Sequence, residues 1–198
     1  MSNSDTPITC ADIPVGKTVT VKVPASSANL GPGYDTLGVA LGFYDELRVE
    51  RISEGLEFEL SGEGSEAVPR DETHLVIQAM YAAFERVGLH EFPALRLTAH
   101  NRIPHSRGMG SSASAIVAGV AAASGLLPEH AQLSRDQILQ VASDLEGHPD
   151  NVAPSVYGSL SISWGELGDW RSLVVPVHSA VVPIVAVPDY EVSTKLAR

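Results

Sequence analysis

Apolar and polar residues alternate in several short stretches near the start of the chain, which is the spacing of half-buried β-strands. The stretch Val19 to Val23 predicts a strand that ends at Pro24. Two further stretches, 47–49 and 56–60, flank a turn at 53–55 and predict two strands of an antiparallel sheet. The N-terminal part of the chain is therefore expected to begin a sheet.

Residues 25–38 interrupt this alternation. They hold three glycines together with Pro32, Asn29 and Asp35. Residues of these types favour turns, because they impose or tolerate unusual backbone dihedral angles. The segment is predicted to be a loop.

Helical patterns follow in the middle of the chain. Apolar residues recur at helical spacing after Thr73 and after Ser134, and residues 112–124 are rich in alanine, which has the highest helix propensity. Ser134 and Gln137 form the Ser-x-x-Gln pattern of a capping box. The predicted helices run from Thr73 to a stop at Gly88, from Ser112 to Ser124 with Gly125 past the end, and from Ser134 to a stop at Gly147.

Strand patterns return at 95–99, 160–164, 174–177 and 181–187. Strands and helices thus mix without strict alternation of one strand and one helix. This order predicts an α+β fold.

Charge and composition narrow the range of partners. The chain has 24 acidic against 13 basic residues and a formal net charge of −11, so we expect neither nucleic acid nor a membrane surface as a partner. Residues 1–14 are predicted to be a flexible terminus without the features of a signal peptide. Cys10 is the single cysteine, which excludes internal disulfides and favours a cytoplasmic location.

A loop rich in glycine and serine, Pro104 to Ala113, leads directly into the alanine-rich helix. Glycines let backbone amides approach an oxyanion, serine hydroxyls add polar groups, and a helix N-terminus carries partial positive charge. The loop therefore predicts a phosphate-binding site, although a plain turn capped by serine gives the same short pattern. It is not a Walker A motif, because it contains no lysine.

Three segments together resemble the GHMP kinases, the group of galactokinase and the homoserine, mevalonate and phosphomevalonate kinases. The loop 104–113 is similar to the family's second motif, which holds the triphosphate of ATP. Residues 25–38 are similar to the first motif of the homoserine kinase branch, and residues 146–154 to the region after its metal ligand. With residues 193–198, the resemblance extends along nearly the whole chain in the family's order.

The resemblance implies a fold and a division into domains. A ribosomal protein S5 domain 2-like, ATP-binding domain would occupy residues 15–175. Residues 176–198 would begin a ferredoxin-like C-terminal domain that is mostly missing from the chain. The family's third motif, a glycine-rich loop that closes on ATP, would lie beyond Arg198, so the activity of the chain by itself is left open.

ATP and Mg²⁺ are the cofactors that the resemblance implies, with L-homoserine as the phosphoryl acceptor in threonine biosynthesis. Ser112 and Glu146 would hold Mg²⁺, which prefers oxygen ligands. Without the motif, Glu146 would be interpreted as a solvated acid at a helix end. The residues carried over for ATP are Pro104, Ser106, Arg107, Gly108, Met109, Gly110, Ser111, Ser112 and Ala113.

The residues carried over for the acceptor amino acid are Asn29, Asp35, His148, Asn151 and Arg198. Asp35 suits an ammonium group, Arg198 a carboxylate, and Asn151 the accepting hydroxyl. Turn and capping roles, or a surface charge at Arg198, are the simpler interpretations without the motif. Asn151 and Asp35 are the predicted catalytic residues, and because an amide takes no proton at neutral pH, the proton would pass to phosphate, solvent or Asp35.

His74 stands where family members commonly show asparagine beside the adenine pocket, so no adenine contact is predicted for it. The other histidines lack the spacing of metal ligands, and we predict no histidine metal site.

Two other functions stay open from the sequence, as does a homodimer. One keeps the fold and replaces homoserine by a mevalonate-like alcohol, against which Asn151 and the 29–35 segment argue. The other is a non-catalytic binding module on an S5-like fold, associated with RNA, against which the net charge of −11 argues.

Overall fold

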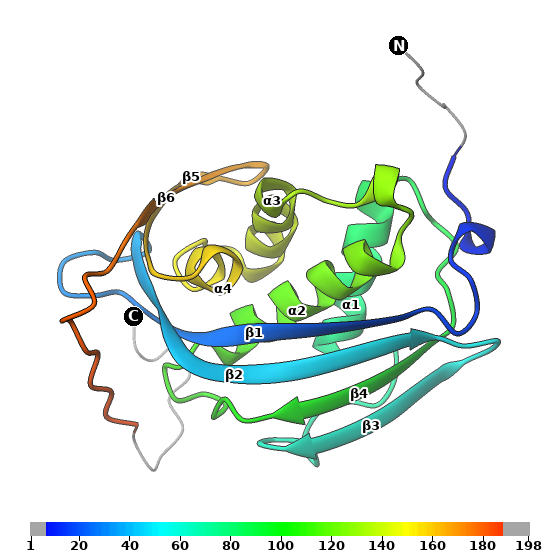
Figure 1. Ribbon diagram of the computed structural model, residues 1–198, viewed down its shortest axis with the longest axis horizontal. Helices are drawn as coiled ribbons and strands as arrows, with labels where there is room; N and C mark the ends of the chain where they lie inside the picture. The colour runs from blue at the N-terminus through cyan, green and yellow to red at the C-terminus, as the bar shows by residue number, and fades with distance from the viewer. Residues whose placement is uncertain (1–6, 188–198) are drawn as a thin grey trace.

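The computed structural model describes residues 7–187, and within them the strands form one sheet with the α-helices on one of its faces (Figure 1). The strands are β1 (Thr18–Ala28), β2 (Leu37–Arg51), β3 (Leu56–Gly62), β4 (Leu95–Asn101), β5 (Leu160–Glu166) and β6 (Asp169–Val175). The α-helices are α1 (Leu75–Arg86), α2 (Ser111–Leu126), α3 (Arg135–Glu146) and α4 (Val152–Tyr157). Single 3₁₀ turns occupy Cys10–Asp12 and Glu129–Ala131. The mixed architecture confirms the α+β prediction.

β2 organises the sheet. β1 pairs with it in antiparallel fashion along one edge. On its other edge, β4 pairs with residues 46–51 and β5 with residues 37–39, both antiparallel. The strand order is β3-β4-β2-β5-β6, so a single long strand connects two halves of the sheet.

The predicted end of the first strand at Pro24 is wrong. β1 continues to Ala28, and the pairing register with β2 shifts between Pro24 and Ser26. A bulge accommodates proline in a strand, because the residue there does not have to donate a ladder hydrogen bond. The predicted loop 25–38 therefore shrinks to residues 29–36.

The stretches 47–49 and 56–60 do form strands on either side of the predicted turn, but they are not neighbours. β4 lies between β2 and β3, and it pairs with β3 in parallel. The chain passes from β3 through α1 to β4, which is the crossover that a parallel pair requires. A pairing between segments some forty residues apart leaves no local signal in the sequence.

Most of the predicted helix ends are confirmed. His74 caps α1 by accepting a hydrogen bond at Nδ1 from Val76 N. Ser134 and Gln137 form the expected capping box of α3, and Gly147 ends that helix in the left-handed conformation. Gly125, however, lies inside α2 instead of past its end, and a Cβ there would lie 2.8 Å from Cγ1 of Val19, so the glycine permits close packing on β1.

The short helix α4 was not predicted. It has six residues and contains Pro154, so it shows neither a helical apolar period nor a favourable composition. It forms directly after Asn151, on the helical side of the sheet (Figure 1).

α2 lies at the centre of the core. Eleven of its sixteen residues are buried, because the helix is covered by the sheet on one side and by other helices on the others. Ile116 of α2, Phe84 of α1 and Leu97 of β4 belong to the same apolar cluster. Each such buried side chain contributes about 1.5–3 kcal/mol through the hydrophobic effect. No helix among residues 7–187 is long and apolar enough to span a membrane.

The two ends of the described chain differ from expectation. Within the segment 1–14, Ile13 is 1% exposed and packs in the main core. Residues 181–187 form no strand, and Ile184 is 96% exposed. Alternating or continuous apolar residues form a strand only beside a partner strand, and none pairs with this segment in the described part of the chain.

Candidate functional site

The loop 104–113 turns sharply before α2. Ser106, Gly108 and Gly110 have φ angles of 55°, 70° and 66°, all in the left-handed region. Gly110 is the N-cap residue of α2, and neither a capping side chain nor an acidic residue occupies the first turn of that helix. The first amides of α2 therefore face outward at the positive end of the helix, which is an arrangement that binds anions.

Gly110 also joins this loop to a second part of the site. A Cβ at this position would overlap Ser26 Oγ and lie 3.0 Å from Asn151 Oδ1. Ser26 N donates a hydrogen bond to Met109 O at 3.1 Å. The Met109 side chain is buried in a small apolar cluster with residues of β1 and β2, so it anchors the loop and does not face a ligand.

Ser112 and Glu146 meet beside the same helix end. Ser112 Oγ donates a hydrogen bond to Glu146 Oε1 at 2.6 Å, which links the first turn of α2 to the last residue of α3. Burial raises the pKa of the Glu146 carboxyl, and the Ser112 hydrogen bond opposes part of this rise.

The chemistry of this pair fits Mg²⁺, which takes oxygen ligands and usually keeps several waters. A cation would also offset the cost of burying the Glu146 carboxylate. Residues 7–187 hold no group of three or more histidine, cysteine or acidic side chains arranged for a metal. The remaining ligands would therefore be water and phosphate oxygens.

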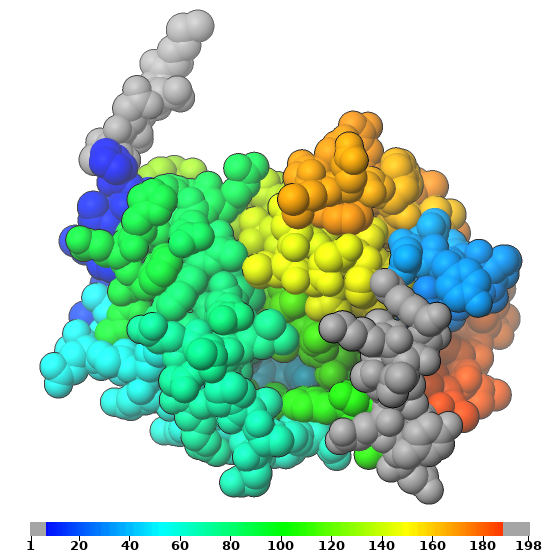
Figure 2. Space-filling view, turned by 180° about the vertical axis from the view of Figure 1, so that it is seen from behind, coloured from blue at the N-terminus to red at the C-terminus, as the bar shows by residue number. Residues whose placement is uncertain are grey.

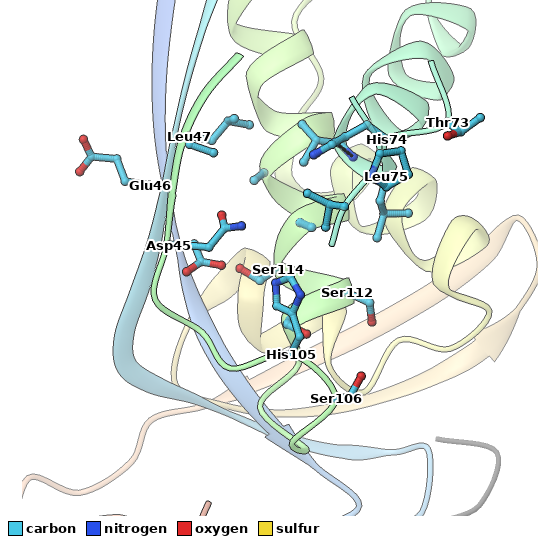
Figure 3. Close-up of a pocket in the computed structure, with 18 residues that line it drawn as sticks. Asp45, Glu46, Leu47, Thr73, His74, Leu75, His105, Ser106, Ser112 and Ser114 are labelled. Atoms are coloured by element: carbon cyan, nitrogen blue, oxygen red, sulfur yellow. Dashed lines mark hydrogen bonds between the residues drawn. The ribbon is translucent and has the colours of Figure 1, made fainter. Parts of the chain in front are cut away.

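A cavity of about 290 Å³ lies beside the loop, between β2, residues 68–76 and α2. It is visible as a hollow between the teal and green surfaces in Figure 2. Ser106, Ser111 and Ser112 of the loop line the cavity, and His74 and Leu75 line it at the end nearer α1 (Figure 3). A ligand whose anionic group sits on the loop could extend its uncharged part into this cavity.

Two further polar side chains line the cavity. Ser114 is 0% exposed, its Oγ has no hydrogen-bond partner among residues 7–187, and Figure 3 shows it on the side facing Asp45. Asp45 Oδ1 accepts hydrogen bonds from the amides of Arg102 at 2.5 Å and Ile103 at 2.9 Å. Burial raises the pKa of Asp45 despite these bonds. An unpaired buried hydroxyl is costly in the free protein, and a ligand in the cavity would pair with Ser114 only if this side chain turned toward it.

The second part of the site is the turn between α3 and α4. Asp150, which is 0% exposed, lies with its Oδ1 2.6 Å from His148 Nδ1. Asn151 Oδ1 accepts a hydrogen bond from Ser26 Oγ at 3.0 Å. A Cβ on Gly38 would overlap the carbonyl oxygen of Asp150, so the glycine allows β2 to pack directly against this turn.

The loop 29–36 completes this part. Asn29 and Asp35 have φ angles of 56° and 52°, which are unusual for residues other than glycine. Asn29 Oδ1 accepts a hydrogen bond from Asp35 N at 3.0 Å, and Asn29 Nδ2 donates one to Asp150 Oδ2 at 3.2 Å. In Figure 2 the blue surface of this loop adjoins the yellow surface of the α3 and α4 region.

The structure thus gathers four of the five residues predicted for the acceptor amino acid, and the fifth, Arg198, lies outside the described residues. Their roles stay predictions. Of the residues predicted for ATP, three serines line the cavity, whereas Met109 and Ala113 are buried in the protein. Pro104, Arg107, Gly108 and Gly110 belong to the loop without lining the cavity.

No role was predicted from the sequence for Ser26, Asp45, Ser114 or Asp150. Asp150 and Ser26 lie inside the motifs 146–154 and 25–38, so the motifs themselves were the available signal. Asp45 lies on a strand and Ser114 within a helix, and neither position carries a local pattern that distinguishes it from a structural residue.

Comparison with known proteins agrees with this geometry. Residues 74–159 match the family model of the GHMP kinases N terminal domain. The chain is 52% identical over 184 residues to a homoserine kinase of Leifsonia xyli, covering 92% of the chain and 57% of that protein. It is 49% identical over 194 residues to a homoserine kinase of Corynebacterium aurimucosum, covering 94% of the chain and 62% of that protein.

Solved structures show the same fold. A homoserine kinase from Cytophaga hutchinsonii superposes with a TM-score of 0.73 at 26% identity, over 91% of this chain and 58% of that one. Mevalonate kinase from Methanococcus jannaschii gives a TM-score of 0.59 at 15% identity, over 80% of this chain and 56% of that one, and shares the fold alone. The chain spans about three fifths of the length of the relatives that it matches. The family model and these likenesses show that the chain contains a GHMP kinases N terminal domain, and both the cradle at the start of α2 and the Ser112–Glu146 pair lie within its residues 74–159.

Proposed function

We propose that this protein transfers the γ-phosphoryl group of ATP to the side-chain hydroxyl of L-homoserine, as a step of threonine biosynthesis. The observation that carries the proposal is the close approach of Gly110 to Ser26 and Asn151, which sets the helix end predicted to bind phosphate directly against the predicted acceptor residues. Phosphoryl transfer depends mainly on positioning and on neutralising charge, and this arrangement serves both.

On the donor side, the amides of the first turn of α2 and the serine hydroxyls of the loop would hold the triphosphate, and the nucleoside would enter the cavity toward His74 and Leu75. Ser112 and Glu146 would hold Mg²⁺, which when bound neutralises charge on the phosphate oxygens. Because the Nδ1 atom of His74 already accepts from Val76 N, it is not free to accept a hydrogen bond from the base.

On the acceptor side, Asn151 would orient the hydroxyl. Its Oδ1 is engaged by Ser26, which leaves the Nδ2 group to donate to the oxygen of the acceptor hydroxyl. An amide does not remove a proton at neutral pH, so the proton would pass to phosphate, solvent or Asp35. Asp35 would bind the ammonium group, and Arg198 the carboxylate.

The names of the relatives favour homoserine over another alcohol, since proteins about 50% identical to this chain are named homoserine kinase. Mevalonate kinases resemble the chain only at the level of the fold. Residues 176–198 as the start of a second domain, a homodimer, a cytoplasmic location and the absence of nucleic-acid partners stay predictions.

A coupled ADP-release assay tests the proposal. The protein expressed from its complete reading frame is supplied with ATP and Mg²⁺ and with L-homoserine, L-serine, L-threonine or mevalonate as acceptor. We expect kcat/KM for homoserine to exceed that for mevalonate at least about 1000-fold, because unpaired polar groups in a site reject a substrate that cannot satisfy them. Higher activity with mevalonate would contradict the choice of substrate.

A binding measurement separates the kinase from a non-catalytic module. ATP with Mg²⁺ should raise the melting temperature of the protein, because a ligand that binds only the folded state stabilises it. The absence of any shift, together with the absence of ADP release, would favour a binding module.

A further inference from the structure

Asp150 is the most enclosed ionisable side chain near the predicted acceptor site. It lies in the turn between α3 and α4, its side chain is 0% exposed, and no role was predicted for it from the sequence. A carboxylate removed from water is costly unless several donors satisfy its oxygens. The donors that hydrogen-bond to Asp150 therefore indicate which groups its buried carboxylate holds in place.

Three donors from two separate segments converge on this carboxylate. Oδ1 accepts from Asn151 N at 2.9 Å and lies 2.6 Å from His148 Nδ1. Oδ2 accepts from Asn29 Nδ2 at 3.2 Å. The NH₂ group of Asn29 and the backbone N–H of Asn151 can only donate, so Asp150 accepts with both oxygens, and we assign the proton of the third bond to His148.

This arrangement sets the tautomer and the orientation of the His148 ring. With a proton on Nδ1 directed at Asp150, the ring of His148 is fixed in orientation. The same carboxylate orients Asn29, whose Oδ1 in turn accepts from Asp35 N at 3.0 Å. Asp150 is thus connected to each of the four described residues that were predicted to bind the acceptor.

We propose that Asp150 is a positioning residue for the acceptor amino acid, which acts by holding His148, Asn29 and the Asn151 backbone in one arrangement. The proposal rests on the proposed function and adds a residue to it. Asp150 does not touch the substrate, since its carboxylate is fully enclosed by protein. Its contribution should appear in the binding of the acceptor and not in the binding of ATP.

The amide of asparagine cannot replace this carboxylate. It offers one acceptor oxygen and one NH₂ group, whereas the site presents donors to both oxygens. In Asp150→Asn, the new NH₂ group must face either Asn29 Nδ2 or the pair formed by His148 Nδ1 and Asn151 N. The Asn29 amide could flip so that its oxygen accepts from this new NH₂ group. Its own NH₂ group would then face Asp35 N, which is also a donor.

The kinetic test compares Asp150→Asn and Asp150→Ala with Asp136→Asn. The control makes the same chemical change outside the acceptor site, at a residue where the asparagine oxygen can still accept the hydrogen bond from Tyr157. We expect both Asp150 variants to raise KM for homoserine about 10- to 100-fold, as loss of an orienting partner does elsewhere. KM for ATP should stay within about 2-fold of the wild type, and Asp136→Asn should change neither constant.

A double variant separates positioning from general damage. Asn29→Ala removes one of the groups through which Asp150 acts, so adding Asp150→Asn to it should raise KM for homoserine by less than the product of the two single effects. Independent, multiplicative effects would overturn the proposal. So would equal increases of KM for ATP and for homoserine, because they would indicate only a loss of structure.

A measurement without substrate keeps the proposal testable if homoserine proves not to be the acceptor. Long-range ¹H–¹⁵N spectra recorded above the titration range of free imidazole report which nitrogen of His148 carries the proton, and a His148→Gln variant assigns the signal. We expect the proton on Nδ1 in the wild type and its transfer to Nε2 in Asp150→Ala. A wild-type protein with the proton on Nε2 would overturn the role of Asp150, whereas inactivity toward homoserine with the proton on Nδ1 would overturn only the proposed function.

Discussion

Ser112 Oγ lies 2.6 Å from Glu146 Oε1, so the first turn of α2 and the last residue of α3 meet at one point. The two residues are 34 positions apart in the chain.

Ser112→Ala and Glu146→Gln should each reduce kcat/KM about 100-fold, because each removes an oxygen that would hold Mg²⁺ against the phosphates. The stabilisation of the protein by ATP with Mg²⁺ should fall, whereas stabilisation by ATP in the presence of a chelator should change little. Steady-state kinetics and thermal melting check both. Glu85→Gln, an exposed residue of α1, serves as the control, and equal losses with and without Mg²⁺ would argue against a metal role.

Gly110→Ala should lower the free energy of unfolding by about 2–4 kcal/mol, because it combines a left-handed backbone with an overlap on Ser26 Oγ. Gly108→Ala is the matched control. Its φ is also left-handed, but a Cβ there meets nothing within 4 Å, so it should cost only about 1–2 kcal/mol. Urea unfolding measures both, and equal costs would show that the Ser26 contact does not constrain the loop.

His74 should make the stability of the protein depend on pH. Burial lowers the pKa of His74 below its ordinary value of 6.5. The unfolded chain therefore takes up this proton as the pH falls through 6.5, while the folded protein does not. The contribution of neutral His74 to the free energy of unfolding is fully present above this pH. It is lost as the pH falls from there toward the lower pKa of the folded state.

Replacing His74 by asparagine removes the titration and keeps a side chain that can cap α1. The difference in the free energy of unfolding between wild type and His74→Asn should therefore shift in favour of the variant below pH 6.5. Urea titrations above and below that pH check this, with the same substitution at the exposed His130 as control. Parallel pH curves for the wild type and His74→Asn would contradict the prediction.

Ser114→Ala should stabilise the free protein by about 1 kcal/mol, because it removes a buried hydroxyl that has no hydrogen-bond partner among the described residues. Ser143→Ala should do the same for the same reason, but Ser143 does not line the cavity. Only Ser114→Ala should weaken ATP binding, by about 5-fold, since one hydrogen bond is worth about 1 kcal/mol. Calorimetry measures the affinities, and equal changes for both variants would exclude a ligand contact at Ser114.

Local signals predicted much of this protein because they depend on a few neighbouring residues. The capping box of Ser134 and Gln137, the stop at Gly147 and the loop before α2 are all decided within four or five positions. The pairing of strands does not depend on neighbouring residues alone. Whether the strand around Phe58 lies beside β2 or beside β4 depends on a helix crossover, and the periodicity of the strand is the same in both cases.

The same reasoning explains what could be predicted of the site. The motifs identified the loop before α2 and the turn between α3 and α4. In the structure these two segments lie together and form the site. The enclosure of Asp150 depends on contacts with Asn29, more than a hundred residues earlier in the chain. An aspartate between proline and asparagine reads as an ordinary turn residue, so its burial had no local signature.

The long strand β2 separates the two proposed binding regions. Gly38 near one end rests on the acceptor turn, and Asp45, seven positions along, lines the cavity proposed for the nucleoside. A strand advances about 3.3 Å with each residue, and side chains change face at every step. Inserting or deleting one residue between them would move one binding region relative to the other and turn Asp45 to the opposite face of the sheet.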